Sequence, residues 1–501
     1  MLLKELIETL SEKNIYGNED IDISGVEYDS RKVKEGSVFV AVKGLVDDGH
    51  LFIGDALKRG AKVVIVNKGF SAINTLIQDK PVTTVAVPDS RKALALVANK
   101  FYNFPSKSLR LIGITGTNGK TTTSYLIESI LKEDGKRTGL IGTINYHIGD
   151  RIVASSKTTP ESSDLQGILK EMVEEKSEFA VMEVSSHSLE LDRVLGCNFT
   201  AAVYTNISPE HLDFHENMKN YLESKKKLFK MLDEMAGDKL RPFAVINADD
   251  PMACEIEDAV SVRSITYGLK PGADVRAVDL NSDFKGIRSR ILFPGDELEI
   301  FSPLIGEFNI YNILASAATT YYLGIRKDKI EKGIESLKSV PGRFQPVECK
   351  GGFDVIVDYA HTPDALLICL TEAKKISRGS VITVFGCGGN RDKSKRPEMG
   401  RIACELSDTV FITSDNPRRE DPVKIIDDIK AGVKGKRSNE KVRIIPDRKE
   451  AIFKALETAN PDDLVVIAGK GHENYQILGE KIIHFDDKEV ISEKLEEMKG
   501  Q

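Results

Sequence analysis

No long apolar run is present in this sequence. Across its 501 residues, no stretch approaches the roughly 20 consecutive apolar residues that a membrane-spanning helix needs. The N-terminal segment, MLLKELIETLSEKN, has the spacing of an amphipathic helix and lacks the features of a signal peptide. We therefore expect a cytoplasmic protein with no membrane span.

Cysteines are few and lie far apart. None of the six belongs to a CxxC pair, so neither a disulfide framework nor a zinc site is indicated. We expect all six to be reduced thiols in the hydrophobic core. They are Cys197, Cys254, Cys349, Cys369, Cys387 and Cys404.

Positive charge is not in excess. The 70 lysines and arginines face 77 aspartates and glutamates, which gives a net charge of −7 at pH 7. A protein that mainly binds nucleic acid or anionic lipid needs the opposite balance. We therefore expect no nucleic-acid partner, and any anionic substrate must be held by local basic groups.

The length of the chain predicts several domains, because 501 residues exceed what one hydrophobic core usually organises. From about residue 22 to 87, short β-rich runs alternate with helical segments, as in a small α/β domain. Pro88 interrupts this pattern, and DSRKALALVANKFYNF then predicts a helix with Asp89 or Ser90 as its N-cap. A second break, VPGRFQPV, lies near Pro341. We predict domains at residues 1–88, 89–340 and 341–501.

The second and third domains are predicted to contain mostly parallel sheets, because strands and helices alternate along both. In the third domain, four apolar runs each end in polar residues: FDVIVDYA, VITVFGCGG, TVFITSDNP and LVVIAGKGH. In an open α/β sheet the ligand crevice lies beyond the carboxyl ends of the strands. We therefore expect a binding site where these runs end, and an α/β fold class for the whole chain.

The most specific motif is GTNGKTTT, Gly116 to Thr123, between a predicted strand and a predicted helix. Its glycines allow backbone N–H groups to surround phosphates, Lys120 can reach the terminal phosphates, and the Thr121 hydroxyl can bind Mg²⁺. A glycine-rich turn with a chance lysine is disfavoured by the flanking strand and helix. The longer GxxxxGK[ST] pattern would need glycine where this chain has Ile114, so the loop is a shorter form. That form points away from motors and GTPases.

Two further clusters follow the phosphate loop. In MEVSSHSLELDRV, Glu183 ends an apolar run and is either a magnesium ligand or a solvated surface acid. In NISPEHLDFH, His211 and His215 follow the run AAVYTNI. Three consecutive lysines from Lys225 come next, and on their own they are more typical of a solvated helix face.

Ten motifs, taken in order, resemble those of the Mur ligases. The resemblance runs from about Tyr28 to Gln476, which is nearly the whole chain. It implies a uridine-nucleotide-binding α/β domain, a central P-loop ATPase domain and a C-terminal Rossmann-like domain. It also implies an ATP-dependent ligase that activates a carboxylate as an acyl phosphate and joins it to an amino group. The motifs are GTNGKTT, EVSSHSL, NISPEHLDFH, YxxxKxxLF from Tyr221, GEFNIYNILA from Gly306, PGRF from Pro341, DYAHTPDAL from Asp358, FGCGGNRDKSKRPEMG from Phe385, DNPR from Asp415 and GKGHE from Gly469.

The resemblance implies roles around the nucleotide. Lys120, Glu183, His211 and Lys225 would be catalytic, with Lys225 modified by CO₂ to a carbamate that binds Mg²⁺. The adjacent Lys226 and Lys227 keep the interpretation of a solvated face. Thr121, Glu183, His211 and the Lys225 carbamate would be the metal ligands. The ATP-binding residues would be Gly116, Thr117, Asn118, Gly119, Lys120, Thr121, Thr122, Asn309, Arg343, Asp358 and His361.

The resemblance also implies two other substrates, UDP-N-acetylmuramoyl-L-Ala-D-Glu and meso-diaminopimelate, which are joined in peptidoglycan precursor synthesis. Many relatives have glutamine two residues before the substrate-binding arginine, where this chain has Leu191. The UDP-sugar dipeptide would be bound by Ser30, Thr158, Thr159, Ser185 and Arg193. Diaminopimelate would be bound by Arg391, Asp415, Asn416, Pro417, Arg418, Gly469 and Glu473.

The preference for diaminopimelate is inferred from DNPR. Diaminopimelate differs from lysine by an additional carboxylate, and Arg418 could pair with it through two parallel hydrogen bonds. Glu473 is placed to pair with the distal ammonium. Two alternatives stay open: Arg418 caps a turn after the strand, or the enzyme is the L-lysine-adding form of the same ligase.

Other function classes fit the sequence less well. A P-loop motor or GTP-dependent switch would share only the phosphate loop, and the chain has no NKxD motif; NKGF at Asn67 has phenylalanine in place of aspartate. An inactive UDP-sugar-binding module conflicts with the intact Lys120 and Lys225. Folylpolyglutamate synthetase shares the central domain, but we would not expect it to carry both DNPR and GKGHE. We expect the ligase to be a monomer.

Overall fold

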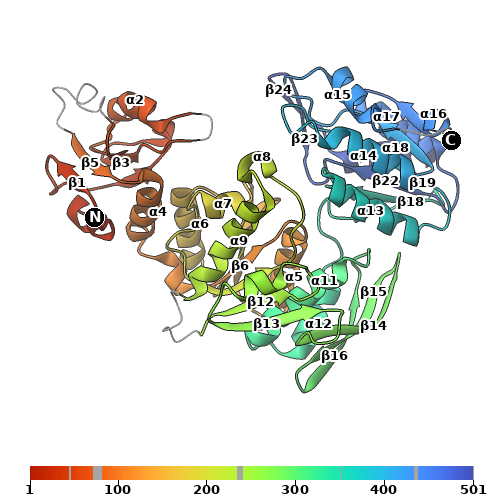
Figure 1. Cartoon of the computed structure of the whole chain (residues 1–501), viewed down its shortest axis with the longest axis horizontal. Helices are drawn as coiled ribbons and strands as arrows, with labels where there is room; N and C mark the ends of the chain where they lie inside the picture. Colours follow the sequence, from red (N-terminus) through yellow and green to blue (C-terminus); the bar gives the residue numbers. More distant parts are fainter. Residues whose placement is uncertain (45–46, 71–81, 234–240, 350, 434–437, 500–501) are drawn as a thin grey trace.

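The computed structural model contains three large sheets, each with its own hydrophobic core, arranged in a row (Figure 1). It describes residues 1–44, 47–70, 82–233, 241–349, 351–433 and 438–499. The N-terminal sheet lies at one end of the row, the largest sheet in the middle and the C-terminal sheet at the other end. The predicted α/β class with three parts is confirmed.

The N-terminal sheet has the order β1-β5-β4-β3-β2, and all its neighbours are parallel except β1 with β5. Helix α4 packs on one face and α2 on the other. The elements are α1 (Leu3–Leu6), η1 (Ile7–Thr9), β1 (Asn14–Tyr16), β2 (Gly25–Glu27), η2 (Ser30–Lys32), β3 (Ser37–Val40), η3 (Gly49–Phe52), α2 (Ile53–Lys58), β4 (Val63–Asn67), β5 (Thr83–Val87), α4 (Ser90–Phe101) and η4 (Pro105–Ser108).

The cap of α4 and the N-terminal helix can both be compared with what the sequence predicts. Asp89 caps α4 by accepting hydrogen bonds from the backbone of Arg91 and Lys92, as predicted. The predicted N-terminal amphipathic helix is instead the short α1 followed by the 3₁₀ turn η1. The reason is that Leu6 and Ile7 are both buried in the core of the sheet, and the tighter turn lets adjacent residues reach it.

Helix α4 belongs by its packing to the N-terminal sheet. Its residues Ala93, Leu94 and Val97 lie in the same core as Val38 and Val63 of that sheet. A boundary at residue 88 would remove this helix from its core. We therefore propose that the N-terminal domain ends after α4.

The central sheet has the order β16-β15-β14-β13-β12-β11-β6-β10-β7-β8-β9. It is parallel from β14 to β7 and ends in antiparallel strands on both sides. Helices α5, α11 and α12 pack on one face, and α6, α9 and α10 on the other. The strands are β6 (Arg110–Thr115), β7 (Thr138–Ile141), β8 (Asn145–Ile148), β9 (Arg151–Ala154), β10 (Phe179–Glu183), β11 (Phe199–Tyr204), β12 (Phe243–Asn247), β13 (Arg263–Gly268), β14 (Val275–Asp283), β15 (Gly286–Phe293) and β16 (Asp296–Ser302).

The central strands β10 and β11 are buried along their whole length, as expected for parallel strands covered on both faces. Their carboxyl ends therefore carry the first residues that can reach a ligand. The helices of this region are α5 (Lys120–Glu133), α6 (Ser162–Glu174), α7 (Ser186–Glu190), α8 (Leu212–His215), α9 (Met218–Asp233), α10 (Ala253–Glu257), α11 (Asn309–Tyr322) and α12 (Lys327–Ser336).

The C-terminal sheet has the order β17-β18-β22-β19-β20-β21, with only β17 antiparallel to its neighbour among the described strands. Helices α13, α14 and α15 cover one face, and α17 and α18 the other. The elements are β17 (Gln345–Val347), β18 (Asp354–Asp358), α13 (Pro363–Ile376), β19 (Val381–Phe385), α14 (Lys395–Leu406), β20 (Thr409–Ile412), α15 (Pro422–Lys430), α16 (Ser438–Lys441), β21 (Val442–Ile444), α17 (Arg448–Thr458), β22 (Leu464–Ala468), β23 (Tyr475–Leu478), β24 (Lys481–His484) and α18 (Asp487–Lys499).

The cysteine prediction is only partly right. Cys197, Cys369 and Cys387 are buried as expected, whereas Cys254 is exposed. The reason is that Cys254 lies on the outer side of the short helix α10, which buries Ala253 and Ile256 instead. Across the described ranges, no helix is both long and apolar enough to cross a membrane.

Candidate functional site

The phosphate loop connects β6 to α5, and two of its glycines are required by the backbone. Gly116 has φ +150° and Gly119 has φ +88°, a region that favours glycine. A Cβ at Gly116 would lie 1.9 Å from Thr205 Oγ1, and one at Gly119 would lie 2.3 Å from Asn312 Oδ1. The loop thus passes close to its neighbours and ends at the N-terminus of α5, where N–H groups favour anions.

The loop is held in place by the residues that follow β11. The backbone N–H of Thr117 donates to Asn206 O at 2.8 Å, and that of Asn118 donates to Asn206 Oδ1 at 2.9 Å. The Thr205 hydroxyl donates to Asn118 O at 2.7 Å. These bonds fix the loop independently of a bound nucleotide.

Two lysine side chains meet at this loop. Lys120 Nζ donates to the carbonyl oxygens of Gly116 and Thr117, at 2.9 and 2.8 Å. Lys225 Nζ, from α9, also donates to Gly116 O at 2.8 Å and lies over the Tyr221 ring. Lys225 is 1% exposed, and its burial together with the charge of Lys120 holds its pKa well below the usual value. Both effects make the ammonium form of Lys225 costly and its neutral amine easier to reach.

Glu183, at the end of β10, is fully buried, which excludes the alternative of a solvated surface acid. Its Oε2 accepts hydrogen bonds from the hydroxyls of Thr121 at 3.0 Å and Thr143 at 2.9 Å. Its Oε1 accepts from the Thr143 N–H at 2.8 Å. Arg343 Nη2 also donates to Thr121 Oγ1, at 3.1 Å. Hydroxyl and carboxylate oxygens thus meet beside the phosphate loop, and this donor set suits a hard divalent cation.

His211 is not part of a preformed metal cluster. In the part of the chain that the structure describes, no three His, Cys, Asp or Glu side chains gather in a way that could hold a metal ion. His211 has φ +56°, its side chain is 44% exposed, and its ring lies 4.6 Å from that of His187. Burial lowers its pKa, which favours the neutral imidazole that metals bind. His215 is buried, and its Nε2 lies 2.9 Å from the Ser186 hydroxyl.

Glu210, which the sequence analysis did not single out, is a charged neighbour of the phosphate loop. Although burial opposes it, the charges of His211 and Lys120 lower the pKa of Glu210. Its side chain is only 17% exposed. The signal in the sequence was its position directly before His211, within PEHLD.

The lysines that follow Lys225 differ from each other. Lys227 is 42% exposed and pairs with Glu190, in agreement with a solvated face. The same interpretation is wrong for Lys226, whose side chain is 10% exposed. It lies between Glu223 and Glu255, at 2.9 and 2.6 Å, and this double pairing compensates for its burial.

Residues predicted to surround the nucleotide come from the C-terminal domain and α11. Arg343 lies over the Tyr359 ring at 4.8 Å, and its buried Nε has no hydrogen-bond partner among the described residues. Asp358 accepts from the backbone N–H groups of Phe344 and Ala360, at 2.6 and 2.8 Å, and burial raises its pKa. Asp358 thus connects the turn after β18 to the PGRF segment that contains Phe344.

His361 and Asn309 both make hydrogen bonds within the protein. His361 Nδ1 lies 2.8 Å from Tyr359 O, and burial lowers the pKa of this histidine. The Asn309 amide donates to Ile305 O at 2.8 Å and its oxygen accepts from Asn312, so both of its polar ends are used. Asn309 thus stiffens the start of α11 beside the phosphate loop.

The candidate amino-acid site lies where β20 and β22 end. Asn416 Nδ2 donates to Glu473 Oε2 at 2.8 Å, so DNPR and GKGHE contact each other directly. Lys470, fully buried, lies 3.4 Å from the same carboxylate oxygen. Burial and the charge of Asp415 raise the pKa of Glu473. A Cβ at Gly469 would lie 3.0 Å from Asp415 Oδ2, which shows how closely the motifs approach.

Arg418 has a left-handed backbone, with φ +54°. Its N–H donates to Ile477 O at 3.0 Å, and its O accepts from the Gly479 N–H at 2.7 Å, which attaches DNPR to the hairpin β23–β24. Its Nη1 donates to Gly389 O at 2.9 Å and makes a longer contact of 3.5 Å with Asn416 O. Pro417 beside it is buried, and Arg391 is exposed. Arg418 therefore does more than cap a turn, because its guanidinium reaches the loop after β19.

The residues predicted to bind the UDP-sugar dipeptide are divided between two domains. Ser30 lies in η2 of the N-terminal domain, whereas Thr158 and Thr159 follow β9, Ser185 follows β10 and Arg193 follows α7 in the central domain. Thr159 is fully buried, donates to Glu183 O at 2.8 Å and is contacted by Arg193 Nη1 at 3.1 Å. Thr158 contacts the Thr143 hydroxyl at 3.0 Å, and Ser185 caps α7. The structure thus brings Thr158, Thr159 and Arg193 close to Glu183, with Ser185 adjacent.

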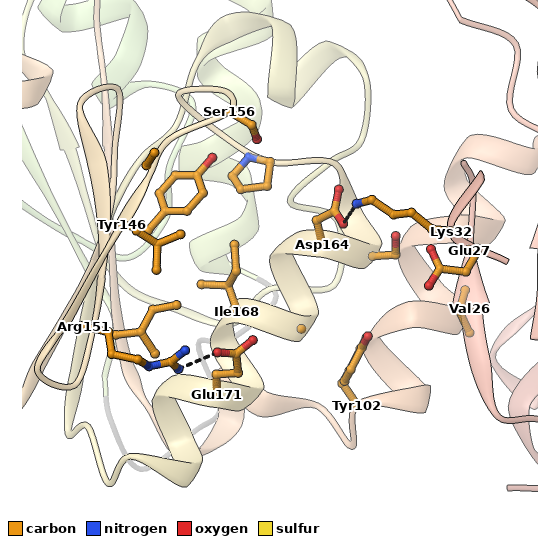
Figure 2. Close-up of a pocket in the computed structure, with 16 residues that line it drawn as sticks. Val26, Glu27, Lys32, Tyr102, Tyr146, Arg151, Ser156, Asp164, Ile168 and Glu171 are labelled. Carbon is orange, nitrogen blue, oxygen red and sulfur yellow. Dashed lines mark hydrogen bonds and ion pairs between the residues drawn. The ribbon is translucent and has the colours of Figure 1, made fainter. Parts of the chain in front are cut away.

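A cavity of about 450 Å³ lies between the N-terminal and central domains (Figure 2). It is lined by Glu27 and Lys32 from one side and by the hairpin β8–β9 and helix α6 from the other. Asp164 pairs with Lys32 at 2.9 Å across the boundary. None of the five residues predicted to bind the UDP-sugar lines this cavity. The cavity therefore belongs to the boundary between the two domains and is separate from the residues predicted to bind the UDP-sugar.

The three α/β sheets and the phosphate loop between β6 and α5 define an enzyme of the class that binds nucleotide phosphates. Three family models match in chain order: the Mur ligase family catalytic domain over residues 22–102, the Mur ligase middle domain over 114–320, and the Mur ligase glutamate ligase domain over 342–471.

Full-length relatives agree with these matches. The chain is 44% identical over 500 residues to UDP-N-acetylmuramoyl-L-alanyl-D-glutamate--2,6-diaminopimelate ligase of Clostridium tetani, covering 99% of this chain and 100% of the relative. It is 46% identical over 490 residues to the protein of that name from Alkaliphilus metalliredigens, covering 97% and 96%. A solved structure of a protein with that name has 32% identity and a TM-score of 0.69, covering 100% of both chains.

The chain belongs to the Mur ligase family. It is an ATP-dependent ligase that forms an amide bond, and its reaction uses ATP and a divalent metal ion. The motor, GTPase and binding-module alternatives are thereby excluded.

Proposed function

We propose that the protein joins meso-diaminopimelate to the D-glutamate carboxylate of UDP-N-acetylmuramoyl-L-Ala-D-Glu, with ATP as co-substrate. The observation that carries the proposal is the contact between DNPR and GKGHE at the ends of β20 and β22, in a chain aligned end to end with ligases of that name. We further propose that it works as a monomer in the cytoplasm, in peptidoglycan precursor synthesis.

The phosphate loop supplies the proposed ATP site. The N–H groups from Gly116 to Thr122 and the ammonium of Lys120 would hold the phosphates, since the loop is held at Asn118 by Asn206 and Thr205. Arg343 has an unused buried N–H beside Thr121, which suits an additional anionic partner. Asp358 and His361 would contact the nucleotide from the C-terminal domain.

Magnesium is the divalent ion that we propose. Thr121 and Glu183 already place oxygen atoms 3.0 Å apart beside the loop, and His211 would join them as the nucleotide binds. When bound, Mg²⁺ would neutralise phosphate charge during transfer.

Lys225 is the proposed site of the carbamate. Its neutral amine would add to CO₂ and release a proton, which converts a buried cation into a buried anion. Two observations support this: Lys225 is fully enclosed, and its nitrogen lies against the same carbonyl as Lys120. An anion would be attracted to Lys120, whereas the ammonium is repelled by it.

The proposed reaction has two steps. The D-glutamate carboxylate attacks the γ-phosphorus of ATP, forming a C–O–P bond as ADP leaves. The amine of the amino acid then attacks the acyl carbon, and phosphate leaves. Lys120 would offset the negative charge that gathers in the first step. Closure by the C-terminal domain would exclude water, which otherwise hydrolyses the acyl phosphate.

Amino-acid recognition is proposed to depend on charge matching. Both hydrogen bonds of the Arg418 guanidinium start at Nη1, so its Nε and Nη2 donors would pair with the distal carboxylate of diaminopimelate. Glu473, already oriented by Asn416, would pair with the distal ammonium. Arg391, Asp415, Pro417 and Gly469 would complete this site.

The UDP-sugar dipeptide is proposed to extend from Ser30 to the neighbourhood of Glu183. Arg193 is oriented by Glu161 at 2.8 Å, and its buried Nε has no hydrogen-bond partner among the described residues. An anionic or carbonyl group of the substrate would satisfy this donor. Thr158, Thr159 and Ser185 would line the path to the phosphate loop.

The decisive experiment is a panel of amino acids tested with UDP-N-acetylmuramoyl-L-Ala-D-Glu and ATP, with phosphate release as the readout. We expect turnover with meso-diaminopimelate and much less with L-lysine. A parallel reaction with folate and glutamate tests the related ligase class and should give no phosphate. Faster turnover with L-lysine would replace the proposed substrate by the alternative, the lysine-adding form.

A further inference from the structure

A fully buried ion pair lies beneath the candidate amino-acid site. Arg448 begins α17 and Asp487 begins α18, two helices that pack side by side on one face of the C-terminal sheet (Figure 1). Both side chains are 0% exposed. Arg448 Nε and Nη2 each donate to one oxygen of Asp487, and both distances are 2.7 Å. The pair is thus bidentate and closed to solvent.

The same guanidinium reaches the two strand ends that carry the amino-acid motifs. Arg448 Nη2 donates to Ala468 O at 3.1 Å, and Nη1 makes a longer contact of 3.5 Å with Ser414 O. Ala468 is directly followed by GKGHE, and Ser414 is directly followed by DNPR. One rigid planar group therefore spans the base of both motifs.

Stability alone is a weak reason for such a pair. Removing two charges from water costs free energy, and well-packed apolar residues often replace a buried ion pair without loss. A guanidinium with five donors can, however, fix two carbonyl groups at a set separation, which an apolar side chain cannot do. The contact between Asn416 and Glu473 at 2.8 Å joins the two segments that follow these carbonyl groups.

We propose that Arg448, held by Asp487, is a positioning residue that sets the spacing between DNPR and GKGHE and thereby the fit of the amino-acid substrate. The proposal rests on the proposed function, because it takes these motifs as the amino-acid site. Arg448 itself lies below the site and touches no substrate.

The test compares the full-length variants Arg448→Lys, Asp487→Asn and the double variant R448M/D487L with wild type. We expect the KM for meso-diaminopimelate to rise about 10- to 100-fold, as for a small misplacement of binding groups, with the KM for ATP changed by less than about twofold. The double variant leaves no unpaired buried charge, so it should fold even where a single variant does not.

Two matched controls separate positioning from helix packing. Lys449 and Glu493 form a neighbouring ion pair of 2.7 Å between the same two helices, but they are 45% and 49% exposed. Lys449→Ala and Glu493→Gln should leave both KM values unchanged. Ile491→Val, which removes a buried methyl group from α18, should lower the melting temperature without a selective rise in the amino-acid KM.

The outcomes distinguish this inference from the function on which it rests. Wild type is measured first, and absence of turnover with meso-diaminopimelate would overturn the proposed function. If wild type is active, a normal amino-acid KM in the folded double variant would overturn the positioning role. A parallel rise of the KM values for ATP and the amino acid would also overturn it, because that indicates general loss of structure.

Discussion

Lys120 and Lys225 donate to the same carbonyl oxygen, that of Gly116, at 2.9 and 2.8 Å. Two ammonium groups at one acceptor repel each other, and burial adds to the cost of charging the second. Lys225 is buried and Lys120 only partly so, and burial together with the charge of Lys120 holds the pKa of Lys225 well below its usual value. A neutral amine is the form that reacts with CO₂.

The first prediction is that Lys225 carries a carbamate. Protein equilibrated with ¹³C-labelled bicarbonate should give a carbamate signal in its NMR spectrum, and Lys225→Ala should abolish it. Lys226→Ala is the control, because Lys226 is the adjacent lysine but is held as an ammonium between two glutamates. A signal that persists in Lys225→Ala would assign the modification to another residue.

The second prediction concerns the phosphate loop. Lys120→Ala should lower kcat by at least about 10²- to 10³-fold, because it removes a cation from the region where negative charge gathers during phosphoryl transfer. Circular dichroism should be unchanged, since the hydrogen bonds of Lys120 lie within its own loop. Lys227→Ala, which breaks only an exposed pair with Glu190, is the control. Near-normal phosphate release by Lys120→Ala would contradict the assigned role.

The third prediction is that Arg418 determines the amino acid. Leaving one carboxylate of diaminopimelate unmatched should cost on the order of 2–5 kcal/mol, so Arg418→Ala should lose most of the preference over L-lysine. The matched control is Arg419→Ala. Arg419 is the adjacent arginine, 76% exposed, and pairs with Glu480. An unchanged ratio of kcat/KM values in Arg418→Ala would show that the preference arises elsewhere.

The sequence predicted the phosphate loop, the three α/β parts and the strand-end position of DNPR and GKGHE, because these depend on local pattern and on the rule for parallel sheets. It left Glu183 undecided between surface and site, since burial is set by strands distant in sequence. It misjudged Lys226, whose partner Glu255 lies 29 residues away. It also missed Arg448, because nothing local distinguishes an arginine that pairs with Asp487 from one on a helix surface.

The fourth prediction concerns a contact between domains. Asp364, in the first turn of α13, accepts hydrogen bonds from Ser208 Oγ at 2.7 Å and from Asn118 Nδ2 of the phosphate loop at 3.2 Å. This contact brings the C-terminal domain to the loop. Ser208→Ala removes one hydrogen bond to a charged group and should lower kcat/KM for ATP by about 10- to 100-fold, and Asp364→Ala, which removes both bonds, should lower it at least as much.

A double-mutant cycle checks this contact. If the two side chains act together, the Asp364→Ala/Ser208→Ala variant should be little worse than either single variant. Glu398→Ala is the control, because Glu398 also lies in the first turn of a helix of this domain and pairs with Arg401 of that helix. Strictly additive losses would show that Asp364 and Ser208 act independently.

The last prediction concerns pH and the domain boundary. Burial raises the pKa of Glu27, beside the cavity in Figure 2, from about 4.5 to about 7, although the charge of Lys32 opposes this. An acid with a raised pKa in the folded state contributes stability below pH 4.5, and that contribution is lost as pH rises to about 7. Above pH 7 the half-buried carboxylate is charged and the N-terminal domain is weakened.

Glu27→Gln should therefore stabilise the protein at pH 8 but not at pH 5. Because Glu27 is only about half buried, solvent screening reduces the expected gain to on the order of 1 kcal/mol. Calorimetric unfolding of wild type and variant at both pH values measures it. Glu35→Gln is the control, because Glu35 is a carboxylate of the same domain that is 72% exposed. The same difference between variant and wild type at both pH values would mean that Glu27 does not titrate in this range, since only a titrating group makes the gain depend on pH.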